Sequence, residues 1–125
     1  MSLQRIIIFV VIGAAIWFIA AVILRKLGGG LFDGGAVHIG VYLGTLVSSP
    51  ALIWVLAKLT GTAPGAMLAP SVVALTTALF LDGIAISWAP AVYGGAGPAL
   101  ALNAAWLLWA VGCFLLSAMA MQKTS

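Results

Sequence analysis

The stretch "MLAPSVVALTTALFLDGIAISW", residues 67–88, contains one charged residue, Asp82, in an otherwise almost wholly apolar run. The hydrocarbon core of a bilayer is about 30 Å thick and needs roughly 20 apolar residues in a helix to cross it. The stretch therefore predicts a transmembrane helix, which decides the class of fold. Asp82 needs its own explanation, because ionisable side chains inside a bilayer are costly and rare.

The composition of the whole chain agrees with this prediction. Of its 125 residues 65% are hydrophobic and 6% charged, and the mean hydropathy is +1.29. A soluble domain carries about a quarter charged residues, so a soluble globular protein is excluded. The five basic residues are spread along the chain and form no patch for nucleic acid. The single cysteine, Cys113, excludes an intrachain disulfide and predicts a packing role.

Three further segments are as long and apolar as the first. The four predicted spans are residues 6–24, 37–57, 67–88 and 99–121. Short segments rich in glycine, proline or charge separate them, at residues 25–36, 58–65 and 89–98. The sequence thus predicts an all-α membrane protein, a single domain over residues 1–125 with four transmembrane helices in an antiparallel up-down bundle. The first span exceeds the apolar core of a signal peptide, so we expect it to be retained.

Four spans place both chain ends on one side of the membrane. Arg5, Lys58 and Lys123 lie on that side, and Arg25 and Lys26 lie on the other. Basic residues are enriched in cytoplasmic loops. This bias predicts a multi-pass protein of the bacterial cytoplasmic (inner) membrane with both termini in the cytoplasm.

Helix geometry places two polar side chains at the same depth. Asp82 lies six residues before Trp88, about 9 Å inside that end of the span at 1.5 Å per residue. Asn103 lies five residues after Pro98, where the fourth span enters from the same side. We therefore expect Asp82 and Asn103 to be neighbours.

The first connection faces the same side and adds further polar residues. His38 opens the second span, and Tyr42, Thr45 and Ser49 continue its face at helical spacing. Arg25 follows the first span on this side. The predicted polar pocket, in the non-cytoplasmic half of the bilayer, comprises Asp82, Asn103, His38, Tyr42 and Arg25.

Asp82 has two interpretations. It is a proton or cation site, or a ligand anchor, because an ionisable residue within a span is a functional hypothesis by default. Alternatively it ties helices together through Asn103, His38 or Arg25. No metal or other cofactor is predicted, since one histidine and one distant cysteine form no ligand cluster. For His38 we expect a hydrogen bond at the membrane interface.

Small residues predict where helices pack closely. Ala78 and Ala85 lie on the helix face that carries Asp82. Gly40 and Gly44 form a G-x-x-x-G pattern, a motif that can pack a partner helix in a membrane. The pattern predicts a homodimer or a larger membrane complex.

Tryptophan and proline positions add two local predictions. Aromatic residues near span ends usually anchor a helix at the membrane interface, and this is the expectation for Trp17, Trp54, Trp88, Trp106 and Trp109. Pro50 follows two serines and is expected to bend the second span, with the hydroxyls bonding the freed carbonyls.

The layout resembles a family of small bacterial four-helix membrane proteins of unknown function. Leu81 and Asp82 carry the most specific part of the resemblance. The motifs concerned are Trp17, "LRKLG" at 24–28, "LFLDG" at 79–83, "WAP" at 88–90 and "AWLLWA" at 105–110. The resemblance implies an integral membrane protein and brings no activity with it.

Function is predicted at the level of class. The leading hypothesis is a non-enzymatic interaction or accessory protein, surrounded by membrane lipid and without nucleic acid as a partner. The alternative is a small proton- or cation-coupled transporter using Asp82. Small multidrug transporters share the length and four spans, but they use a glutamate in the first span, where this chain has no acid. A single histidine argues against a two-histidine haem site in one chain, and no acid, base and nucleophile set indicates an enzyme.

Overall fold

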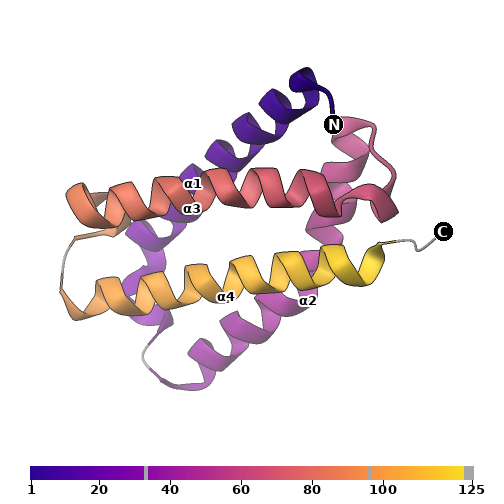
Figure 1. The fold of residues 1–125 in the computed structure, drawn as a ribbon. Coiled ribbons are helices and arrows are strands. Elements are labelled where there is room, and N and C mark those ends of the chain that lie inside the picture. Colours follow the sequence, from indigo (N-terminus) through magenta and orange to yellow (C-terminus); the bar gives the residue numbers. More distant parts are fainter. Residues whose placement is uncertain (33, 96, 123–125) are drawn as a thin grey trace.

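A computed structural model describes residues 1–32, 34–95 and 97–122, so Lys123 lies outside the described residues. Its helices are α1 Leu3–Leu31, α2 Ala36–Thr60, η1 Pro64–Ala66, α3 Leu68–Trp88, η2 Pro90–Tyr93 and α4 Pro98–Met121. The four α-helices are each long and apolar enough to cross a membrane, which confirms the predicted class of fold. Consecutive α-helices run in opposite directions, and α1 begins at the end of the bundle where α4 ends (Figure 1).

The helix α1 is longer than predicted. It continues through the glycines at 28–30 to Leu31, whereas the sequence predicted a connection over 25–36. Glycine weakens a helix by about 1 kcal/mol relative to alanine, but no proline follows to end it. Gly34, with φ of 88°, then takes the left-handed conformation in the short turn before α2.

The helices pack chiefly in two pairs, α1 against α3 and α2 against α4. The closest approach within the first pair is at Gly13, where an added Cβ would lie 2.1 Å from the carbonyl oxygen of Ala74. Ala78 and Ala85, predicted as packing residues, are buried. Small residues on both helices therefore let the two backbones touch, as membrane helix packing requires.

Two clusters of buried apolar side chains hold the bundle together. The cluster nearer the chain ends contains Phe9, Ile53, Ala57, Met67, Ala74, Leu75, Phe114 and Ala118. The cluster near the other end contains Ala21, Leu24, Phe32, Ala85, Tyr93 and Leu107. Cys113 is also buried, in keeping with its predicted packing role.

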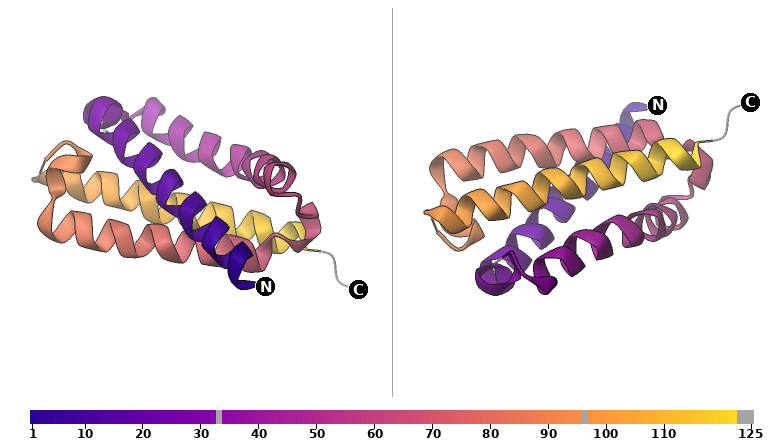
Figure 2. Two further views of the ribbon diagram at one scale, coloured as in Figure 1. Left: turned by 90° about the horizontal axis from the view of Figure 1, so that it is seen from above. Right: turned by 90° about the horizontal axis from the view of Figure 1, so that it is seen from below.

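The helix α2 continues through Pro50 and changes direction along its length (Figures 1 and 2). The hydroxyls of Ser49 and Ser48 donate to the carbonyl oxygen of Thr45, at 2.7 and 3.3 Å. We expected them to bond the carbonyl freed by proline, which belongs to Leu46. A serine side chain reaches carbonyls three or four residues back, and here both hydroxyls reach the same one.

Candidate functional site

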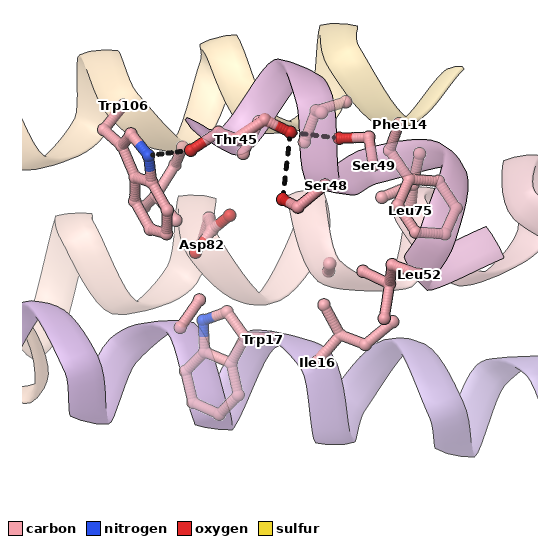
Figure 3. Close-up of a pocket in the computed structure, with 15 residues that line it drawn as sticks. Ile16, Trp17, Thr45, Ser48, Ser49, Leu52, Leu75, Asp82, Trp106 and Phe114 are labelled. Atoms are coloured by element: carbon pink, nitrogen blue, oxygen red, sulfur yellow. Dashed lines mark hydrogen bonds between the residues drawn. The ribbon is translucent and has the colours of Figure 1, made fainter. Parts of the chain in front are cut away.

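A cavity of about 230 Å³ lies inside the bundle and is lined by all four α-helices. Its polar wall is made by Thr45, Ser48 and Ser49 of α2 and by Asp82 of α3, and the rest is mainly apolar. Ser48 is the middle residue of its span, and Asp82 lies only four residues beyond the middle of α3. The cavity is therefore at mid-depth, deeper than the pocket expected from the sequence. Figure 3 shows the Asp82 carboxylate between Trp17 and Trp106 and facing the cavity.

Asp82 is held by a residue from the connection between α3 and α4. The Tyr93 hydroxyl donates a hydrogen bond to Oδ1 of Asp82 and accepts one of 3.0 Å from Nε1 of Trp17. The side-chain amide of Asn103 donates to the Tyr93 carbonyl oxygen at 3.1 Å. Asp82 and Asn103 thus bind the same residue, Asp82 at the phenol and Asn103 at the backbone, and the direct bond between them considered from the sequence is not formed.

Tyr93 reaches the interior because its connection folds back into the bundle. The residue ends the short helix η2, and Gly94 and Gly95 follow with φ of 102° and 122°. Such angles suit glycine, and they let the chain turn while the phenol stays buried, 2% exposed. Burial raises the pKa of the Tyr93 phenol above its ordinary value, and the hydrogen bond to Asp82 raises it further. Tyr93 therefore keeps its proton and donates a hydrogen bond to the carboxylate.

Asp82 lacks a basic partner in residues 1–32, 34–95 and 97–122. Arg25, predicted as part of the pocket, is exposed on α1. The Arg5 side chain donates instead to the Thr62 hydroxyl near the chain ends. With 8% of its surface exposed, Asp82 is a buried acid whose described partners are neutral hydrogen-bond donors.

His38 and Tyr42 lie at a different place from Asp82. They line an open groove on the surface together with Gly34, Ile39, Leu43 and Trp109. Nδ1 of His38 accepts a 3.1 Å hydrogen bond from the Gly34 amide, and its ring lies 5.0 Å from that of Tyr42 between centroids. The structure therefore divides the predicted pocket. Asp82 and Asn103 bind Tyr93 inside the bundle, whereas His38 and Tyr42 line the outer groove. Within the described part of the chain no group of His, Cys, Asp or Glu could hold a metal ion.

Three tryptophans bind neighbouring elements rather than the membrane interface. Besides Trp17, the indole of Trp106 donates to the Thr45 hydroxyl at 3.0 Å, and that of Trp109 donates to the Tyr42 carbonyl at 2.9 Å. The interface prediction was wrong for these three, because they lie well inside their spans, where an indole N–H needs a protein partner. The other two, Trp54 and Trp88, are exposed.

No close contact among residues 1–32, 34–95 and 97–122 uses the G-x-x-x-G pattern. Gly40 and Gly44 are exposed on α2, and a Cβ added at either would meet no atom within 4 Å. The close contact between helices in this chain is made instead at Gly13, which the sequence analysis did not single out. The sequence does carry a signal for this contact, because Gly13 lies in an apolar span beside two alanines.

Comparison with protein-family models, curated proteins and solved structures finds no match to this chain. The family suggested by the sequence motifs is therefore not identified. What the resemblance implied about architecture holds, since the protein has four helices that can span a membrane. The site must be interpreted from its own geometry.

Proposed function

We propose that this protein is a small non-enzymatic, proton-coupled membrane carrier in which Asp82 takes up and releases a proton. One observation carries the proposal: Asp82 faces a mid-membrane cavity and has no basic partner among the described residues. A buried charge is stabilised by an opposite charge or lost by neutralisation. A cation that enters the cavity supplies the opposite charge, and a proton neutralises the carboxylate.

The neighbours of Asp82 suit a site rather than a structural tie. Tyr93 and Trp17 form a chain of hydrogen bonds that ends on one oxygen of the carboxylate. These hydrogen bonds orient the carboxylate of a residue that also lines the cavity. A tie between helices needs no such cavity, and ionisable residues of this kind mark ion and proton pathways in membrane proteins.

Infrared difference spectroscopy in lipid nanodiscs tests the proposal. We expect the carboxylic-acid band of Asp82 to appear and disappear reversibly as the buffer is changed between acid and alkaline pH. The band should be absent in Asp82→Asn, which keeps an oxygen to accept from Tyr93 and should fold as the wild type does. A carboxyl band that ignores buffer pH while the bundle stays folded would contradict the proposal. So would an Asp82→Asn variant that loses its stability.

A second candidate function is that of an interaction or accessory protein, and the bare glycine face of α2 favours it. Gly40 and Gly44 leave open space that a helix of a second copy of this chain can occupy. Native mass spectrometry should find dimers of the wild type and monomers of Gly44→Leu. Gly112→Leu, at another exposed helical glycine with open space, is the control and should remain dimeric. A monomeric wild type in lipid would contradict this function.

The location follows from the same considerations. We infer that the protein lies in the bacterial inner membrane with both termini in the cytoplasm. Arg5 and Lys58 lie at the end of the bundle that carries the chain ends, and basic residues are enriched on the cytoplasmic side. The variants Ser2→Cys and Ala36→Cys, each in a Cys113→Ala background, can be labelled in intact spheroplasts with an impermeant maleimide. Ala36→Cys, at an exposed position at the start of α2, should react and Ser2→Cys should not. The reverse result would invert the orientation.

A further inference from the structure

Given the proposed function, we propose that the substrate of the central cavity is a small hydrophobic organic monocation, such as a one-ring quaternary ammonium. Its charge lies at Asp82, between Trp17 and Trp106, and its apolar body lies toward Phe114. The size, charge, wall chemistry and opening of the cavity each support this class.

The size of the cavity limits the substrate to a single ring or a short branched chain. An engineered apolar cavity of about 150 Å³ holds benzene. The cavity here has a volume of about 230 Å³, so it can hold a ring of that size with a few additional carbon or nitrogen atoms.

The wall has a charged end and an apolar end. Figure 3 shows Asp82 near Trp17 and Trp106, and shows Leu52, Leu75 and Phe114 farther along. A cation over the face of tryptophan is attracted by the ring, the more so away from water. A molecule with a positive head and an apolar body therefore matches both ends. An anion would meet the Asp82 carboxylate, and a neutral molecule would leave it without a counter-charge.

A bare divalent metal ion does not fit this wall. Mg²⁺ and Ca²⁺ take about six to eight oxygen ligands at short distances. The cavity offers the Asp82 carboxylate on α3 and three hydroxyls on α2. Those of Ser48 and Ser49 are directed at the Thr45 carbonyl, and that of Thr45 already joins Val41 and Trp106.

The opening of the cavity suits a substrate that arrives through the lipid. The helices α1 and α2 make little contact and diverge from their short connection (Figure 2). Ser48 and Leu52 of α2 line the cavity and are also exposed on the outside. The cavity thus opens sideways at mid-depth, where an apolar body lowers the cost of entry.

A pair of nearly isosteric probes tests the charge. Phenyltrimethylammonium and tert-butylbenzene have almost the same shape, and only the first is charged. With the full chain in zwitterionic nanodiscs, we expect saturable quenching of tryptophan fluorescence by phenyltrimethylammonium, corrected against empty nanodiscs. Binding should weaken about tenfold or more in Asp82→Asn. The uncharged tert-butylbenzene partitions strongly into the lipid itself, and its effect after the correction against empty nanodiscs should not depend on Asp82.

A second variant tests the cavity without touching Asp82. Ala110→Leu places a larger side chain in the cavity wall and should also weaken phenyltrimethylammonium binding about tenfold or more. Ala101→Leu, at an exposed position of the same helix, should bind as the wild type does. Cation binding that is unchanged in Asp82→Asn or Ala110→Leu would overturn the inference.

The two proposals fail in different ways. If the Asp82 carboxyl band responds to pH but phenyltrimethylammonium and tert-butylbenzene behave alike, the substrate class is wrong and the proton site stands. If the carboxyl band ignores pH, the proposed function itself fails, whatever the probes do.

Discussion

Nε1 of Trp17 donates a 3.0 Å hydrogen bond to the hydroxyl oxygen of Tyr93, 76 residues away in the sequence. An indole N–H can only donate, so the phenol oxygen accepts here and directs its own proton to Asp82. A residue of α1 thus sets the orientation of a phenol in η2, which in turn orients the acid on α3. Trp17 and Tyr93 are positioning residues for Asp82.

Replacing Tyr93 by phenylalanine should destabilise the protein. The change leaves the Asp82 oxygen and the Trp17 N–H without their shared partner, at a cost of about 1–2 kcal/mol. Chemical unfolding in detergent micelles measures it. Tyr42→Phe is the matched control, because Tyr42 accepts from Trp109 through its backbone carbonyl and keeps that bond. Equal losses in the two variants would mean that the Tyr93 hydroxyl contributes nothing specific.

Alkaline pH should destabilise the protein through Tyr93. The phenol pKa is raised in the folded protein, relative to about 10 for an unfolded chain. The stabilisation is therefore fully present below about pH 10 and is lost as pH rises toward the folded value. Ultraviolet titration should show phenolate from one tyrosine forming only at higher pH, and Tyr93→Phe should remove that late step. A wild type in which the Tyr93 phenolate forms in the ordinary range would contradict the prediction.

Adding one methyl group at Gly13 should separate α1 from α3. In Gly13→Ala the new Cβ would lie 2.1 Å from the Ala74 carbonyl oxygen, too close for any contact. Overpacking of this kind costs about 1–3 kcal/mol, which thermal unfolding in nanodiscs can measure. Gly112→Ala adds the same group on α4 into open space and should be neutral or slightly stabilising. The contact has no role if Gly13→Ala unfolds at the wild-type temperature.

Thr45 and Trp106 should be energetically coupled. Their 3.0 Å hydrogen bond joins α2 to α4 beside the cavity. Hydrogen bonds between membrane helices contribute about 0.6 kcal/mol on average and about 1.7 at most. A double-mutant cycle with Thr45→Val and Trp106→Phe should give a coupling in this range. Strictly additive effects on unfolding would show that the bond does not stabilise the pair.

Part of the site could be predicted from helix geometry. Asp82 and Asn103 were placed at one depth by counting residues from the span ends, and both do meet at Tyr93. Tyr93 itself was missed, because a tyrosine between glycines and prolines has the pattern of an exposed turn. Its burial depends on how the connection folds back into the bundle, and the spacing of apolar residues in the sequence does not predict that path.

The separation of His38 and Tyr42 from Asp82 could not be predicted in the same way. Helical spacing put Tyr42 and Thr45 on one face of the second span, yet Thr45 lines the cavity and Tyr42 lines an outer groove. Which stretch of a helix faces inward depends on its direction and on the bend near Pro50. The bend is expected from Pro50, and the direction of α2 goes with its packing against α4.

The sequence by itself determined that this chain forms four membrane-spanning helices with alternating directions. Hydropathy and length are sufficient for that, because a bilayer demands about 20 apolar residues with all backbone groups bonded inside the helix. Only the tertiary structure decided that α1 pairs with α3 at Gly13 and that Tyr93 enters the bundle to bind Asp82. Those choices depend on the close fit of side chains between helices, where lipid and protein are equally apolar and hydropathy no longer distinguishes one neighbour from another.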